Sequence, residues 1–116
     1  MQHRDKIIVQ KIADELRIGL DMLGERSLED FMQDEVLKRA LAMTVVNIGE
    51  LVKNITMETR EANPQIPWKE MAGMRDIAAH RYQTLRMEDV YCTVKDDFST
   101  LVPLMKELLS QAKQVS

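Results

Sequence analysis

The sequence contains few of the residues on which β-sheet proteins rely for turns and strands. Its 116 residues include four glycines and three prolines, and aromatic residues make up 4% of the chain. A turn-rich sandwich or barrel is therefore not expected. Hydrophobic residues, among them nine methionines, make up 45% and charged residues 30%, a balance that excludes intrinsic disorder. We predict a single all-α domain over residues 1–116.

The sequence also has little with which to hold a metal ion or to form a disulfide. Cys92 is the only cysteine, and the chain has two histidines, so neither an intramolecular disulfide nor a structural zinc site is expected. There is no charged-then-apolar leader and no uninterrupted apolar run of about 18 residues. We therefore expect a soluble cytoplasmic protein that needs no metal or other cofactor and no membrane.

The net charge of −3, from 16 basic and 19 acidic side chains, excludes a protein whose whole surface binds nucleic acid. Any contact with RNA or DNA must be local. The best candidate is the stretch 68–86, which has a local charge of +2. It holds the basic residues Lys69, Arg75, Arg81 and Arg86 and the acidic residues Glu70 and Asp76.

Apolar residues recur three or four positions apart in four segments, which is the pattern of amphipathic helices. The first helix is predicted over residues 4–23 and ends at Gly24. The second begins after Ser27, whose side chain resembles a capping residue with Asp30 three positions later. It reaches about Ala62, either as one helix or as a short turn followed by a long helix.

Two further helices complete the expected fold. One is predicted over residues 67–80, because Pro67 suits a first helical turn, and the last runs from about Val90 to about Lys113. Pro103 lies inside the last helix and should kink it. Four helices with short connections predict an up-down antiparallel four-helix bundle.

Three glycines lie inside predicted helices, where each costs up to about 1 kcal/mol relative to alanine. They are Gly19, Gly49 and Gly73. The simpler interpretation is that each lets two helices approach closely, and the functional one is that each leaves room for a ligand or partner.

Residues capable of chemistry gather at the end of the third predicted helix. Arg75, His80 and Tyr82 fall within eight residues and use one of the two histidines and one of the two tyrosines. On a helix, Asp76 and His80 lie four apart on one face, so the carboxylate can orient the imidazole and favour its protonated form. Arg75 lies about 140° around the helix from His80, so both reach one point only if the helix end relaxes.

A histidine that moves protons and an arginine that binds phosphate suit the cleavage of RNA by its own 2′-hydroxyl without a metal. The reaction needs an acid and a base, yet one histidine lies here. A two-fold dimer that brings two copies of Arg75 and His80 to one cleft supplies both. We therefore expect a homodimeric endoribonuclease with Arg75 and His80 as catalytic residues, Asp76 as an orienting residue, and Arg81 and Arg86 in substrate binding.

A structural interpretation of the same residues stays open. His80 at a helix C-terminus could simply complement the helix dipole, and Arg75 with Asp76 could be surface charge. Tyr82 could cover the core with its ring. The methionines are more typical of adaptable core packing than of a binding surface.

Along almost its whole length the sequence resembles the HepT-like branch of the HEPN superfamily, the toxin halves of HepT–MNT toxin–antitoxin pairs. The resemblance rests on three stretches. These are Ile48-Gly49-Glu50, the run from Ile66-Pro67-Trp68 to Arg75-Asp76-Ile77, and His80-Arg81-Tyr82. The last two together contain the pattern Arg-x4-His-x-Tyr.

The resemblance implies a metal-independent ribonuclease, built as a helical bundle that dimerises around paired Arg75 and His80. It also implies a partner, the minimal nucleotidyltransferase antitoxin (MNT), which modifies the motif tyrosine with AMP, and Tyr82 is the matching acceptor. Asp76 stands where the family often has Asn, and Arg81 where Glu is common, but neither change removes a catalytic group. The alternative function is a non-catalytic module that binds or presents a target to a nucleotidyltransferase.

Overall fold

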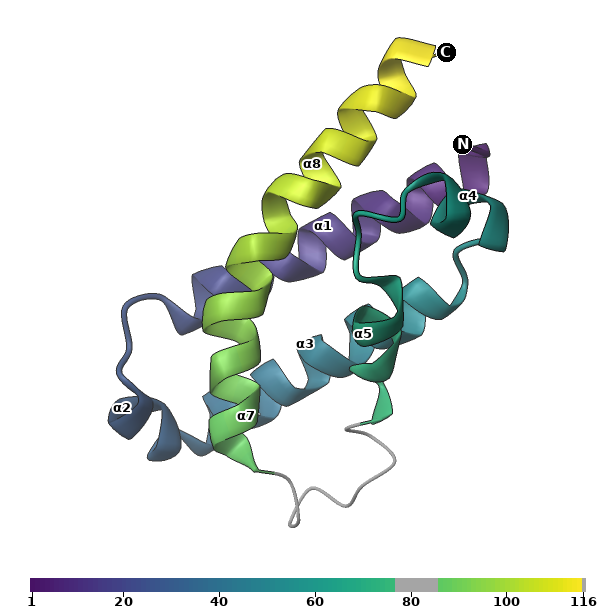
Figure 1. Ribbon diagram of the computed structural model, residues 1–116. Helices are drawn as coiled ribbons and strands as arrows, with labels where there is room; N and C mark the ends of the chain where they lie inside the picture. Colours follow the sequence, from purple (N-terminus) through teal and green to yellow (C-terminus); the bar gives the residue numbers. More distant parts are fainter. Residues whose placement is uncertain (77–85, 116) are drawn as a thin grey trace.

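The computed structural model describes residues 1–76 and 86–115, with side chains as far as Gln111, and this part of the chain forms helices joined by turns. Figure 1 shows three long helical rods, namely α1, α3 and the run of α7, η2 and α8, with shorter helices between them. The predicted all-α bundle is confirmed. The helices are α1 (His3–Leu23), α2 (Leu28–Met32), α3 (Glu35–Lys53), α4 (Met57–Ala62), α5 (Trp68–Gly73), α7 (Met87–Cys92), the π-helical turn η2 (Thr93–Asp97) and α8 (Phe98–Val115).

Helix α1 lies at the centre of the bundle. It packs against α3 and against α8, and α5 packs on α3. Ile12 and Leu16 in the middle of its apolar stripe are fully buried. A Cβ added at Gly19 would lie 2.6 Å from the Phe98 ring and 3.3 Å from Thr44, so this glycine allows the close approach of three helices, as its position predicted. No helix in residues 1–76 and 86–115 is long and apolar enough to cross a membrane.

The end of α1 agrees with the sequence prediction. Gly24 follows Leu23 with φ 56°, a left-handed backbone that glycine adopts without steric cost. The Ser27 side chain then accepts a hydrogen bond from the Asp30 N–H at 3.1 Å and caps α2. Helix α2 is a single short helix, and α3 begins after Asp34, whose carboxylate accepts the Leu37 N–H at 3.0 Å. Of the two alternatives predicted for the region after Ser27, one continuous helix or a short turn followed by a long helix, the second is therefore correct.

The long helix does not continue to Ala62, so that boundary is wrong. It ends at Lys53, and α4 begins separately after Thr56, whose hydroxyl accepts the Thr59 N–H. The Arg60 guanidinium donates to the carbonyls of Val52, at 2.7 Å, and Ile55, at 3.3 Å, which satisfies groups at the end of α3.

The buried carboxylate of Asp5, near the N-terminus, stabilises the break between α3 and α4. Asp5 is fully buried and accepts hydrogen bonds from the Thr56 N–H, at 3.2 Å, from the Thr56 hydroxyl, and from the Thr59 hydroxyl, at 2.6 Å. Burial by itself would raise the pKa of Asp5, but these hydrogen bonds and the nearby Arg4 cation hold its pKa below the ordinary value. The carboxylate therefore ties the first turn of α1 to the start of α4 at neutral pH.

The last helix departs from regular geometry where Pro103 and its neighbours lie. The turn η2 is π-helical, the Ser99 hydroxyl donates to the Lys95 carbonyl at 2.7 Å, and the Thr100 hydroxyl donates to the Asp96 carbonyl at 3.2 Å. Pro103 also has no N–H to give to the turn before it. All three features bend helices, and Figure 1 shows the rod changing direction between α7 and the C-terminus.

Candidate active site

Helix α5 is held on the bundle by its first turn. Trp68 is 7% exposed and donates its indole N–H to the Asn63 carbonyl at 3.0 Å, and Met71 is fully buried. After Gly73 the helix loosens into a turn, in which the Arg75 N–H bonds to the Ala72 carbonyl at 3.3 Å. The helix predicted over 67–80 is therefore confirmed over Trp68–Gly73, but it is interrupted earlier than predicted by the turn at residues 74–75, and residues 77–80 lie outside the described part of the chain.

The backbone of Arg75 rests directly on α3 at Gly49. A Cβ at Gly49 would lie 2.8 Å from the Arg75 Cβ and 2.9 Å from its Cα, and closer still to its backbone nitrogen. Backbone atoms cannot yield as a flexible side chain can, so α3 and the Arg75 turn approach this closely because residue 49 has no side chain. The close-approach interpretation is confirmed here. At Gly73, by contrast, an added Cβ would meet no atom of residues 1–76 and 86–115 within 4 Å, so this part of the chain shows no close approach there.

The Arg75 side chain lies beside a carboxylate of α3. Its Nε is 3.6 Å from Glu50 Oε1, and the two side chains are 35% and 55% exposed. A pair this accessible contributes about 0–1 kcal/mol to stability, so its effect is on the direction of the guanidinium more than on the fold. Because two-thirds of the side chain is covered, Arg75 is anchored yet still accessible to an anion.

Two other predicted residues are exposed, and one has acidic neighbours. Asp76 is exposed at the end of the Arg75 turn. Arg86 precedes α7, and its Nε lies 3.9 Å from both Glu88 and Asp89. The charge of +2 predicted for the stretch 68–86 is therefore opposed in space by these two carboxylates and, at Arg75, by Glu50.

The remaining predicted site residues, His80, Arg81 and Tyr82, lie outside the described residues. The pairing of Asp76 with His80 and the convergence of Arg75 with His80 therefore stay predictions. The second histidine, His3, is the first residue of α1 and is exposed. Figure 1 places this end of α1 beside α4, away from the end of α5 that leads to Arg75. Among the described residues, no three His, Cys, Asp or Glu side chains gather closely enough to hold a metal ion.

Two hollows lie beside the Arg75 turn. One, of about 450 Å³, runs between α1 and α3 and includes Glu50 in its lining. The other, of about 260 Å³, lies between α5 and α8 and is lined in part by Met71, Met74 and Asp97. Burial, and then the neighbouring Asp96, raise the pKa of Asp97.

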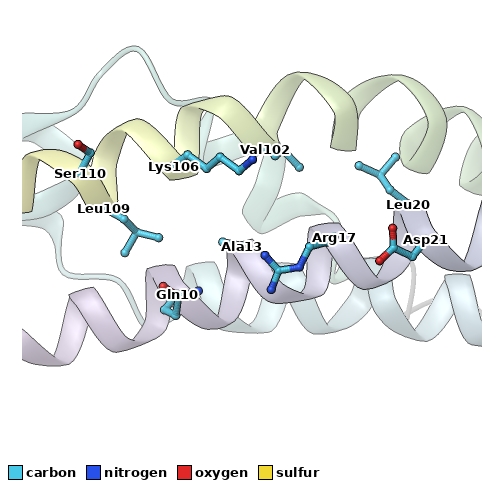
Figure 2. A pocket seen from close by; sticks show the side chains of 9 residues that line it. All are labelled: Gln10, Ala13, Arg17, Leu20, Asp21, Val102, Lys106, Leu109 and Ser110. Atoms are coloured by element: carbon cyan, nitrogen blue, oxygen red, sulfur yellow. The ribbon is translucent and has the colours of Figure 1, made fainter.

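A third hollow, of about 420 Å³, lies between α1 and α8 and shares no lining residue with the other two. Figure 2 shows Arg17 and Lys106 reaching into it from opposite helices, with Leu20 and Leu109 turned toward the same space. The Arg17 guanidinium is already bound by Asp14 at 2.7 Å. Neither α3 nor α5 contributes to its walls, so this hollow is separate from the Arg75 turn.

Comparison with known proteins identifies the family of the chain. The family model described as Ribonuclease HepT-like matches residues 12–108, which include α3, α5 and the Arg75 turn. The chain belongs to the HepT-like ribonuclease family. It is 35% identical to "Putative RNase TTE0752" of Caldanaerobacter subterraneus subsp. tengcongensis over 90% of this chain and 94% of that protein. It is 33% identical to "Probable ribonuclease HepT" of Thermococcus cleftensis over 87% of this chain and 92% of that protein. It is also 40% identical to "Putative RNase MJ1216" of Methanocaldococcus jannaschii over 82% of this chain and 79% of that protein. No solved structure matches the chain significantly.

Glu50 is the residue of this HepT-like site to which sequence reasoning assigned no role. It stands next to Gly49, a glycine that helix propensity had already marked as needing compensation. That signal indicates a close contact at this turn of α3, but not its partner, because Arg75 is 25 residues away in the sequence.

Gly49 and Gly73 allow a matched pair of variants, for which we expect different changes in the free energy of unfolding. Gly49→Ala should lower the free energy of unfolding by about 1–3 kcal/mol, because the added methyl group meets the Arg75 backbone. Gly73→Ala should leave it unchanged or raise it by up to about 1 kcal/mol, because its methyl group meets no atom of the described residues. Urea unfolding of both variants measures this difference. Equal effects from the two changes would show that α3 and Arg75 are not in close contact.

Proposed function

We propose that this HepT-like chain is a metal-independent endoribonuclease, the toxin of a toxin–antitoxin pair, and that it acts on RNA in the cytoplasm as a homodimer. The observation that carries the proposal is the setting of Arg75. This first residue of the Arg-x4-His-x-Tyr pattern is fixed at its backbone by Gly49 and oriented by Glu50, with its side chain partly exposed. An anchored, accessible guanidinium is what binding of a phosphodiester requires.

In this scheme the RNA supplies the nucleophile. The 2′-hydroxyl attacks the adjacent phosphorus as an imidazole takes its proton, the bond to the 5′-oxygen breaks, and a second imidazole protonates that oxygen. Arg75 stabilises the negative charge that builds on the phosphate oxygens. His80 supplies the imidazole of each chain, Asp76 orients it, and Arg81 and Arg86 bind neighbouring phosphates. The two imidazoles come from the two chains of the dimer.

The proposed partner is a minimal nucleotidyltransferase antitoxin that transfers AMP from ATP to Tyr82: the phenol oxygen loses its proton and bonds to the α-phosphorus, and pyrophosphate leaves. The surroundings of the other tyrosine support this choice. Tyr91 is 6% exposed, packs against Phe31 with ring centroids 5.4 Å apart, and donates its hydroxyl to the Arg26 carbonyl at 2.9 Å. A hydroxyl that is buried and engaged is a poor acceptor for a bulky nucleotide, which leaves Tyr82.

The test is to incubate the purified, unmodified protein with RNA in the presence of EDTA. We expect cleavage that the chelator does not change, products that end in a 2′,3′-cyclic phosphate, and no cleavage where the scissile position carries a 2′-deoxy sugar. Cleavage that stops in EDTA would contradict the metal-independent mechanism. RNA or nucleotidyltransferase binding without any cleavage would instead favour the non-catalytic module.

A further inference from the structure

The hollow of about 420 Å³ between α1 and α8 lies where these two helices diverge toward the chain termini (Figure 1). Its volume falls in the range of about 300–1,000 Å³ that is typical of small-molecule sites. Nine residues line it, five from α1 and four from α8. The proposed ribonuclease function uses none of them, so the hollow calls for a separate explanation.

Both helices present the same pattern to this hollow, namely a cation between two apolar side chains. On each helix the cation follows one apolar residue by four positions and precedes another by three, which places all three on one side of the helix. These residues are Ala13, Arg17 and Leu20 on α1 and Val102, Lys106 and Leu109 on α8. Figure 2 shows the two cations reaching into the hollow from opposite walls. Apolar surface therefore flanks a central pair of positive charges.

The two cations differ in the partners they already have. In the part of the chain whose side chains the structure describes, no carboxylate pairs with Lys106. The Arg17 guanidinium donates through Nη2 to Asp14 Oδ1 at 2.7 Å, and its other N–H groups remain for a second anion. Gln10, which also lines the hollow, donates to the same oxygen at 3.1 Å. Because two positive charges directed into one space repel each other, an anion between them is stabilised.

The charges around the hollow limit what the anion is. The two cations are balanced by Asp14, which is bound to Arg17, and by Asp21, which lies at one end of the hollow in Figure 2. A surface whose local charge is zero does not hold the phosphate backbone of RNA. A second negative charge on the ligand would meet Asp21. A single anionic group can instead lie between Arg17 and Lys106, with apolar atoms on either side of it.

We propose that this hollow is a binding site for an organic monoanion, a molecule with one carboxylate or sulfonate group on an apolar body. The anionic group accepts charge-assisted hydrogen bonds from Arg17 and Lys106. The apolar body covers the flanking side chains, among them Leu20 and Leu109, and removes them from water. Because the bound molecule contacts both helices, it also holds the part of α8 after Pro103 against α1.

The test uses anilinonaphthalene sulfonate, a fluorescent monoanion, with octanoate as a competitor that does not fluoresce. Wild type should bind the probe, and octanoate should displace it. Acetate has the charge without the chain, and octanol has the chain without the charge, so neither should displace the probe at the same concentration. Octanoate should also raise the melting temperature of the protein, because it binds the folded state.

Lys106→Met is the decisive variant, since it removes the charge and keeps an unbranched apolar side chain. It should bind the probe and octanoate at least about 10-fold more weakly than wild type, the effect of losing a hydrogen bond between charged groups. Lys11→Met is the matched control, because Lys11 is an exposed cation of α1 that does not line this hollow, and it should bind both as wild type does. Circular dichroism checks that both variants keep their helices.

Three results would overturn the assignment of a monoanion site. They are the absence of binding to wild type, an equal affinity in Lys106→Met and Lys11→Met, and displacement of the probe by acetate or octanol alone. Single-stranded RNA that displaces the probe from wild type would show that RNA occupies the hollow instead. None of these measurements uses RNA cleavage, so their outcome is independent of the proposed ribonuclease function.

Discussion

Replacing His80 by alanine is expected to lower the rate of RNA cleavage by at least about 100-fold, because general acid–base catalysis contributes about 10²–10⁴-fold. In the proposed dimer one change removes both imidazoles, so the loss should lie toward the upper end of that range. The chain offers a matched control in its other histidine. His3 is exposed at the first residue of α1, so His3→Ala should cleave RNA as wild type does.

The same assay tests the arginine. Arg75→Ala should reduce cleavage by about 10²–10³-fold, since removing one group that stabilises transition-state charge has an effect of this size. Little change in stability is expected, because the pair with Glu50 is exposed and weak. Cleavage that persists in His80→Ala, or that falls equally in His3→Ala, would show that the proposed acid and base are wrong.

The second large effect concerns the antitoxin. With a cognate minimal nucleotidyltransferase and ATP, wild type should gain the mass of one or more AMP groups and lose its nuclease activity. Each adduct brings negative charge and bulk to a site that must bind phosphate, so it should exclude the substrate. Tyr82→Phe should keep most of the nuclease activity, because the phenol is neither acid nor base in this scheme, and should be insensitive to antitoxin and ATP.

Tyr91→Phe is the control for that experiment. It loses the hydrogen bond to the Arg26 carbonyl, which should lower the free energy of unfolding by about 1 kcal/mol, but it keeps the proposed acceptor. Intact mass spectrometry should therefore show the same AMP adducts on Tyr91→Phe as on wild type and none on Tyr82→Phe. An equal adduct on Tyr82→Phe, or none on wild type, would leave complex formation alone as the explanation of neutralisation.

The end of a helix could be predicted from the sequence where a residue at that end determines it. The predicted range 4–23 for the first helix matches His3–Leu23, because Gly24 ends it through its own backbone conformation. The break after Lys53 could not be predicted in the same way. Apolar residues continue at helical spacing through Val52 and Ile55, while the chain is turned by a contact of Asp5 with Thr56, 51 residues away.

The same limit applies to the candidate active site. The pattern of Arg75, His80 and Tyr82 can be read from one stretch of chain, since its spacing is local. The carboxylate beside Arg75 cannot, because Glu50 approaches it from a different helix, whereas Glu88 lies only two residues after Arg86, just outside the stretch 68–86. A local count of charge therefore overstated how basic this surface is.

Trp68 gives the protein an internal optical probe at this site. It is the only tryptophan, it lies seven residues before Arg75, and its indole is buried where α5 meets the bundle. Its emission reports on the polarity around that one ring, so a shift to longer wavelength signals that α5 has left its place on α3. Fluorescence of the unlabelled chain thus distinguishes a variant that has lost a catalytic group from one in which the segment carrying that group is no longer docked.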